Sequence, residues 1–282
     1  ALLYSYMTVL NPGDEAILLS PSWASYEPMI SIIGGVPVNV PVDRKNFHPD
    51  MDAIRSSITN RTRMIMVNSP CNPTGAVYAR EEIEEIVSIA IEHDLWIVSD
   101  EIYSRLIWNG GEHVSPATIE GGKERTIVIS GWSKTWAMTG MRVGFLAGPE
   151  QAVRAAVKCQ ANSASHIPTF MMEAARVALD CDDHVERFSD AYRQRRKLMV
   201  QGLEDIPGLR IVNPEGAFYL FIDVSGTGMS DVEFADGALE AGVQLIPASL
   251  ITGGEGFIRV SYAASEEDIK EGISRLRSWL LQ

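Results

Sequence analysis

Short apolar runs alternate with segments of helical apolar spacing along the first half of this 282-residue chain. Six of these runs are predicted as β-strands, at residues 16–19, 36–40, 63–67, 95–99, 126–129 and 143–147. The segments predicted as helices between them are residues 23–33, 50–58 and 79–93. Strands that alternate with helices form a mostly parallel sheet with helices on both faces. The sequence therefore predicts an α/β fold.

The pattern changes near residue 182. A long charged helix is predicted at residues 184–203, and the later elements mix strands with helices. The predicted strands are residues 209–212, 217–222, 243–246 and 257–262, and the predicted helices are 231–241 and 265–281, the last with Ser265 as its N-cap. We therefore expect a large domain at residues 1–184. A smaller α+β domain with its linking helix is expected at residues 185–282.

The net charge of −13 excludes some classes of partner. Non-specific attraction to nucleic acid or to an anionic membrane needs a basic face, so we expect neither partner. No apolar run reaches the roughly 20 residues that a membrane span needs. The three widely spaced cysteines are an odd number, which favours a reducing cytoplasm over a disulfide framework. The five histidines show no metal-ligand spacing, so no metal site is predicted.

Polar side chains follow three of the predicted strands. Asn72 lies just beyond the third strand, Asp100 ends the fourth, and Tyr103 comes three residues later. Ser133 and Lys134 follow the fifth strand. Ligands of open α/β sheets bind beyond the carboxyl ends of the strands. We therefore expect an amide, a carboxylate, a phenol and an amine to face one crevice.

Asp100 and Lys134 could be a buried ion pair with a purely structural role. Such a pair is a poor device for stability, because removing two charges from water is costly. Titratable groups at strand ends more often serve function. A lysine of lowered pKa forms imines with carbonyl compounds, and a pyridoxal-phosphate (PLP) site needs this lysine with an acid for the pyridine nitrogen. The two residues thus fit a PLP site.

Three segments carry a family resemblance. They are SPCNPTG at residues 69–75, SDEIY at 99–103 and SKTWAMTGMRVG at 133–144. In order and spacing they resemble the signature segments of class I and II aminotransferases of the aspartate aminotransferase type. The likeness extends from about residue 11 to residue 262. It implies a fold-type I PLP-dependent transferase, with a large α/β domain and a smaller C-terminal α+β domain.

The resemblance implies a role for each residue near the cofactor ring. Lys134 would hold PLP as a Schiff base and then move the proton between the substrate Cα and the cofactor. Asp100 would pair with the protonated pyridine nitrogen. Tyr103 and Asn72 would donate hydrogen bonds to the phenolate oxygen of the cofactor, with Asn72 also beside the substrate.

The same resemblance assigns residues to the phosphate, the ring face and the substrate. Arg142 would bind the phosphate, where a forked guanidinium suits an oxyanion, and Ser133 would assist it. Trp23 would stack on the pyridine ring, and Arg259 would bind the substrate α-carboxylate. Gly131 stands where many relatives have a serine that contacts the phosphate, so a backbone amide is expected to replace that hydroxyl.

The resemblance also suggests an N-terminally truncated chain. Family members begin well before the segment that matches residue 11. Their additional part supplies a glycine-containing phosphate cup, a segment for substrate selectivity and an arm that crosses to a second subunit. We therefore expect a homodimer when the protein is full length.

The function that the resemblance implies is amino transfer from an α-amino acid to a 2-oxo acid by a ping-pong mechanism. One alternative is a PLP-dependent lyase, because β- or γ-elimination passes through the same carbanion. Another is the effector-sensing module of a transcription regulator that follows a DNA-binding helix-turn-helix. The amino acid accepted is not readable, since selectivity depends on the missing segment and on loops around Trp23 and Leu250.

Overall fold

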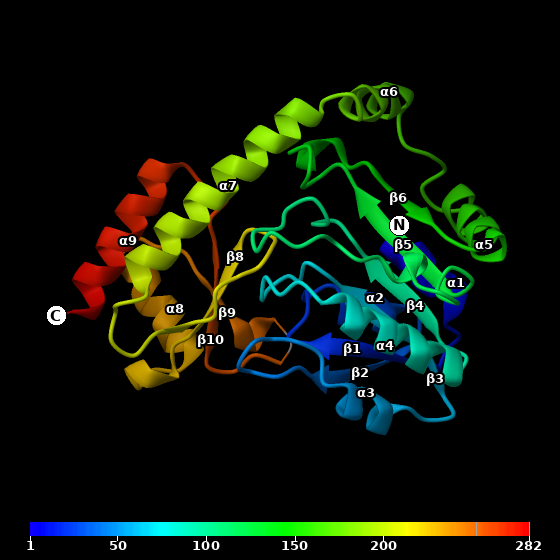
Figure 1. Cartoon of the computed structure of the whole chain (residues 1–282), viewed down its shortest axis with the longest axis horizontal. Helices are drawn as coiled ribbons and strands as arrows, with labels where there is room; N and C mark the ends of the chain where they lie inside the picture. The colour runs from blue at the N-terminus through cyan, green and yellow to red at the C-terminus, as the bar shows by residue number, and fades with distance from the viewer. Residues whose placement is uncertain (252, 282) are drawn as a thin grey trace.

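Two sheets organise the computed structural model, which describes residues 1–251 and 253–281 (Figure 1). The larger sheet has the order β2-β1-β3-β4-β5-β6. Its strands are β1 (Glu15–Ser20), β2 (Val36–Pro41), β3 (Thr62–Asn68), β4 (Trp96–Asp100), β5 (Thr126–Gly131) and β6 (Gly144–Ala147). All neighbouring pairs are parallel except β5 and β6, which are antiparallel. The predicted mostly parallel sheet is confirmed.

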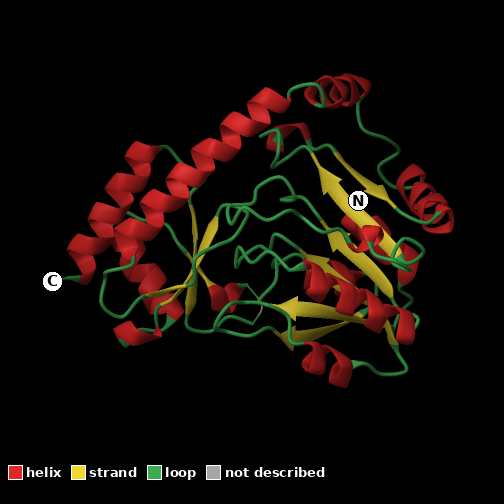
Figure 2. Ribbon diagram, viewed as in Figure 1, coloured by secondary structure: helices red, strands yellow, loops and turns green. Residues whose placement is uncertain are grey.

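Helices cover both faces of this sheet (Figure 2). The helices of this half are α1 (Leu2–Val9), α2 (Tyr26–Ile32), α3 (Met51–Ser57), α4 (Arg80–Glu92) and α5 (Glu150–Ala161). Successive strand residues point to opposite faces. Ile17 accordingly packs in a cluster with Ile54 and Ile83, from α3 and α4. Leu18 packs in the opposite cluster with Tyr6 and Ile30, from α1 and α2.

The smaller sheet is antiparallel and has the order β7-β8-β10-β9. Its strands are β7 (Arg210–Ile211), β8 (Tyr219–Asp223), β9 (Ile246–Pro247) and β10 (Phe257–Ser261). The remaining helices are α6 (Thr169–Ala178), α7 (Asp182–Leu203), α8 (Asp231–Glu240) and α9 (Glu266–Leu280), and four short 3-10 turns complete the fold. Figure 1 shows α7 leading from the large sheet towards the small one. No helix among the described residues is long and apolar enough to cross a bilayer.

Two of the contacts between the two sheets fix the loops near the site. Phe47, from the loop after β2, packs edge-on against Phe221 and Phe257 of the small sheet, with ring centroids 5.5 and 5.6 Å away. The segment before β8 is hydrogen-bonded to the loop after β3, since the amides of Glu215 and Gly216 donate to the carbonyl of Gly75 at 2.9 and 2.8 Å. The residues that follow β3 are therefore fixed against the small sheet.

The predicted element boundaries are only partly right. The helix predicted from residue 23 begins at Tyr26, and the strand predicted at 243–246 is β9 (Ile246–Pro247). Ser265 is the N-cap of α9 as predicted, because its Oγ accepts a hydrogen bond from the amide of Asp268 at 3.0 Å. The domain boundary between residues 184 and 185 falls within α7 and stays a prediction.

Candidate active site

Three neighbouring parallel strands end at one edge of the large sheet. β3 ends at Asn68 and β4 at Asp100, and these two residues are paired in register. β5 lies on the other side of β4 and leads into the loop with Lys134. The carboxyl ends of parallel strands form the ligand-binding edge of an open sheet. The predicted polar residues are thus brought to that edge by strand order.

Asp100 is a buried carboxylate with polar partners. Its Oδ2 accepts a hydrogen bond from Tyr26 Oη at 2.8 Å, and its Oδ1 accepts one from the amide of Ile102 at 3.2 Å. Burial raises the pKa of Asp100 from 3.8 to about 6, although these hydrogen bonds oppose the rise. Within the described part of the chain it forms no salt bridge. The site therefore leaves a buried acid that a cationic ligand would stabilise.

Tyr26 was missed by the sequence analysis. It is almost fully buried, and its hydroxyl bonds to an acid 74 positions away in the chain. The available signal was the end of β1, which lies beside β3 at the same edge of the sheet.

Asn72 and Arg259 link the two sheets. The backbone N–H of Asn72 donates a hydrogen bond to Asn68 Oδ1 at 2.9 Å, and this bond holds the loop after β3. Asn72 Oδ1 accepts a hydrogen bond from Arg259 Nη1 at 3.1 Å. The Arg259 guanidinium, from β10, also lies 4.9 Å from the centre of the Tyr219 ring. Two predicted residues, 187 positions apart, are thus in direct contact.

Tyr103 is buried beside the same group. Its hydroxyl lies 3.0 Å from that of Tyr219 on β8. Burial, with the neighbouring Tyr219, raises the pKa of Tyr103 well above its usual range. A phenol that stays protonated can donate a hydrogen bond to a ligand oxygen.

Lys134 lies half-buried on the loop after β5, with Nζ 5.6 Å from the centre of the Phe218 ring. Burial lowers the pKa of Lys134, and the positive charges of Arg142 and Arg259 lower it further, against the opposite effect of Asp100. No salt bridge to its amine occurs among residues 1–251 and 253–281. An amine of lowered pKa is a better nucleophile near neutral pH.

The other three predicted residues, all of them described in the structure, form no hydrogen bond with Asp100, Tyr103, Asn72 or Lys134, although the charge of Arg142 acts on Lys134. Trp23 packs edge-on against Tyr26, with ring centroids 5.3 Å apart, and Tyr26 in turn donates a hydrogen bond to Asp100. The carbonyl of Ser133 accepts a hydrogen bond from Thr139 Oγ1 at 2.9 Å. Arg142 is exposed at a left-handed φ of 55°, and its Nη1 donates to the carbonyl of Thr139 at 3.0 Å. The arginine and the serine are therefore engaged with their own loop.

These residues fit the cofactor predicted from the sequence. Asp100 is a buried acid without a cation, as a protonated pyridine nitrogen would require. Lys134 is an amine of lowered pKa on the neighbouring strand end. Tyr103 supplies a hydroxyl and Asn72 supplies an amide, and both contact residues of the small sheet. The donor set suits PLP.

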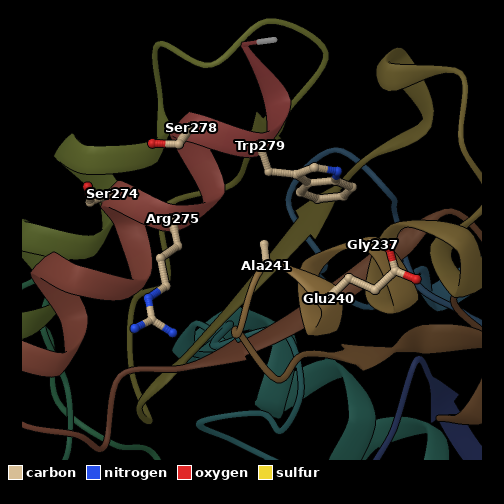
Figure 3. A pocket seen from close by; sticks show the side chains of 7 residues that line it. All are labelled: Gly237, Glu240, Ala241, Ser274, Arg275, Ser278 and Trp279. Atoms are coloured by element: carbon tan, nitrogen blue, oxygen red, sulfur yellow. The ribbon is translucent and has the colours of Figure 1, made fainter.

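Two surface concavities lie away from this edge. One, of about 410 Å³, lies between α8 and α9 and is shown in Figure 3. Its charged lining residues are Glu240 and Arg275. The other, of about 760 Å³, surrounds the start of α7. Neither includes a predicted site residue. No group of three potential metal ligands occurs in the part of the chain that the structure describes.

Comparison with known proteins gives a consistent set of matches. Residues 1–276 match the family model described as aminotransferase class I and II. The aspartate/prephenate aminotransferase of Thermus thermophilus is 40% identical over 280 residues, which are 98% of this chain and 71% of that protein. An aromatic-amino-acid aminotransferase of Thermococcus litoralis is 39% identical over 285 residues, covering 99% of this chain and 73% of its own length.

Solved structures agree with these sequence matches. The crystal structure of an aromatic aminotransferase from Pyrococcus horikoshii superposes with a TM-score of 0.97 at 38% identity, and covers 100% of this chain and 76% of that one. Aspartate aminotransferase from Thermus thermophilus with maleate gives a TM-score of 0.94 at 39% identity, with 99% and 73% covered.

Proposed function

Because the chain belongs to the class I and II aminotransferases, we propose that it moves an amino group from an α-amino acid to a 2-oxo acid at the edge formed by β3, β4 and β5. The predicted family, fold type and cofactor are confirmed, since enzymes of this family depend on PLP. The positions of the cofactor and substrate within this chain are the proposal. The reaction would be ping-pong, with the oxo acid leaving before the second substrate enters.

One observation supports this location above all: an acid of raised pKa and an amine of lowered pKa lie on neighbouring strand ends. When bound, PLP supplies an electron-withdrawing ring that stabilises negative charge on the substrate Cα. Lys134 would hold the cofactor through Nζ, and once displaced by the substrate it would take the proton from Cα. Asp100 would keep a proton on the pyridine nitrogen.

The remaining residues would bind and orient. Tyr103 and Asn72 would donate hydrogen bonds to the ring oxygen of the cofactor. Arg259 would bind the substrate α-carboxylate with two parallel hydrogen bonds, a geometry that guanidinium groups favour.

Three further residues would complete the cofactor site. Trp23 would cover the ring, a position consistent with its contact to Tyr26. Arg142 would exchange its bond to the Thr139 carbonyl for the cofactor phosphate, with Ser133 beside it. The exposed guanidinium of Arg142 is free to make that change.

The names of the relatives suggest the substrates. Those quoted above are named for aspartate, prephenate and aromatic amino acids. We infer that this chain accepts a dicarboxylic or an aromatic amino acid. A panel of donors with 2-oxoglutarate tests this, with glutamate and the oxo acid of the donor measured in the same sample.

The donor panel also separates the two alternatives. An aminotransferase forms glutamate and the new oxo acid in equal amounts. A lyase would instead release ammonia and form no glutamate, and an effector-sensing module would turn over none of the donors. Either result would overturn the proposed reaction.

We also propose that the protein works as a homodimer in the cytoplasm. Large apolar side chains are exposed on α5 and α6, among them Val157, Phe170, Met172 and Val177, and a second copy would cover them. The three free cysteines suit a reducing compartment. Light scattering should give twice the mass of one chain, and a monomer would contradict the dimer.

A further inference from the structure

Tyr219 contacts two residues to which different ligands have been assigned. Its hydroxyl lies 3.0 Å from that of Tyr103, which would face the cofactor. Its ring lies 4.9 Å from the guanidinium carbon of Arg259, which would bind the substrate. No sequence motif assigns a role to Tyr219. It is buried, so its hydroxyl and its ring are both held in place.

The backbone holds Tyr219 in this position. It begins β8 and is paired in register with Ser261, two residues beyond Arg259 on β10. Just before it, the amide of Ala217 donates to the carbonyl of Leu106, on the loop that follows Tyr103, at 2.9 Å. The strand end is thus tied both to the arginine strand and to the tyrosine loop.

The hydroxyl contact has one direction that suits function. Tyr103 has a single O–H, and under the proposed function it donates that proton to the cofactor oxygen. It can then only accept from Tyr219. A hydroxyl that accepts one hydrogen bond donates a stronger one, because the two bonds polarise each other. The Tyr219 hydroxyl would therefore strengthen the bond that Tyr103 makes to the cofactor.

The ring contact acts on the other ligand. A guanidinium over an aromatic face is attracted by the ring, and the contact limits its movement. Asn72 Oδ1 holds the same guanidinium through Nη1 at 3.1 Å. With these two contacts Arg259 is oriented before a carboxylate arrives.

We propose that Tyr219 is a positioning residue that serves both halves of the site, with its hydroxyl orienting Tyr103 towards the cofactor and its ring orienting Arg259 towards the substrate carboxylate. The proposal rests on the proposed function. The hydroxyl and the ring of Tyr219 therefore have separate effects, one on cofactor binding and one on substrate binding.

Two variants separate the parts. In the PLP-loaded enzyme, Tyr219→Phe removes the hydroxyl and keeps the ring. The pH midpoint of the absorbance change of the bound cofactor should then rise by roughly 0.3 pH unit, because Tyr103 becomes a weaker donor. The apparent KM for the 2-oxo acid should stay within about twofold, since the cation–π contact remains. Tyr219→Leu should raise the midpoint similarly and raise KM about tenfold, as the contact is lost.

Tyr192→Phe is the matched control. Tyr192 stacks on Phe218 at 5.2 Å in the same aromatic cluster, and its hydroxyl contacts neither Tyr103 nor Arg259. Neither the midpoint nor KM should change in this variant. An unchanged midpoint in Tyr219→Phe would overturn the hydroxyl role, and an unchanged KM in Tyr219→Leu would overturn the ring role. If Tyr219→Leu does not fold, Tyr219→Phe still tests the role of the hydroxyl.

Tyr103→Phe distinguishes this proposal from the proposed function. If that variant shifts the midpoint while Tyr219→Phe does not, the cofactor site stands and the role of Tyr219 is wrong. If Tyr103→Phe also leaves the midpoint unchanged, the assignment of Tyr103 to the cofactor is wrong, and the role of Tyr219 falls with it.

Discussion

Asp100 combines a functional demand with a cost in stability. In the folded chain the Asp100 carboxyl group is buried, and burial raises its pKa from 3.8 to about 6. Such an acid binds more protons folded than unfolded between those two pH values. The free energy of unfolding therefore falls as the pH rises through this window, and the loss is complete above it. A cationic ligand would relieve that cost.

Asp100→Asn should accordingly stabilise the ligand-free chain while it abolishes transfer. At pH 8 the gain should be up to about 3 kcal/mol, the value that corresponds to the rise in pKa. It should shrink as the pH falls towards 4, where the acid is protonated in both states. Urea unfolding of both proteins at several pH values measures it. If Asp100→Asn were less stable than the unchanged protein at pH 8, burial of the carboxylate would not be destabilising.

Arg259→Lys tests recognition of the substrate carboxylate. Lysine keeps the charge but loses the forked geometry, so KM should rise for both the amino acid and the oxo acid. The loss should be on the order of 1.5–3 kcal/mol, as for a hydrogen bond to a charged group. Arg210→Lys is the control, because Arg210 is paired with Asp223 at 3.0 Å in the same sheet. Equal KM values for Arg259→Lys and the unchanged enzyme would assign the carboxylate to another residue.

Asn72, Asp100, Tyr103, Ser133 and Lys134 were found because each follows the end of a predicted strand, whereas Trp23, Arg142 and Arg259 were found through the family resemblance. Asp100 and Lys134 could be located in this way because β4, with five residues, and β5, with six, are apolar runs that the sequence shows as strands. Tyr26 follows the end of β1 at the same edge, but its bond to Asp100 joins residues 74 positions apart. Tyr219 begins a strand, and only its contact with Tyr103, 116 positions away, reveals its place in the site. The outward direction of Arg142 follows from a single left-handed residue, which no periodicity signals.

At the scale of elements, the loop after β3 depends on a close approach of two backbones. Gly75 has φ of +73°, and a Cβ there would come within 2.5 Å of Pro214 Cβ. Its carbonyl accepts the two hydrogen bonds from residues 215 and 216 that join this loop to β8. A side chain at Gly75 would thus push the loop with Asn72 away from Arg259.

Gly75→Ala should therefore destabilise the protein and weaken PLP binding together. Gly13→Ala is the matched control, because Gly13 also has a positive φ, +89°, but a Cβ there would have nothing within 4 Å. Each change should cost about 1–2 kcal/mol for the left-handed backbone. Only Gly75→Ala should cost more and raise the dissociation constant of PLP, as fluorescence titration would measure. Equal losses of stability and of PLP binding in Gly75→Ala and Gly13→Ala would show that the close approach of Gly75 to Pro214 does not position the loop.

Element prediction succeeded where an element is long and one face is buried. Helix α4 has a clear apolar stripe and was placed within one residue at each end. Strands β7 and β9 have two residues each, too few to show a period of two. Helix α6 carries exposed apolar residues, such as Phe170 at 67% exposure, so its pattern does not reveal which face is inward.

For the whole molecule, Phe47 makes an apolar contact between the two sheets. It is fully buried between Phe221 and Phe257, which stack on each other at 4.8 Å. Residues of β8 and β10 thereby belong to the same apolar cluster as α3 and α4. The proposed division at residues 184 and 185 therefore separates two sheets that have one apolar cluster in common, while the other face of the small sheet packs in a cluster of its own.

Phe47→Ala should lower the free energy of unfolding by about 3–5 kcal/mol, as for other large core truncations. The left-handed φ of Phe47 does not confound the change, because alanine carries the same backbone restriction. Phe145→Ala is the control, since Phe145 on β6 is 42% exposed. Urea unfolding should show a small change for Phe145→Ala. Similar losses for both would mean that Phe47 does not join the sheets.

The attachment of PLP to Lys134 is tested most directly by chemical reduction. Borohydride fixes the bond between the cofactor and its lysine, and mass spectrometry of the digested protein then identifies that lysine. We expect the label on Lys134. The chain has five other lysines, Lys45, Lys123, Lys158, Lys197 and Lys270. A label on one of these in the active enzyme, with Lys134 unmodified, would contradict the assignment and with it the proposed site.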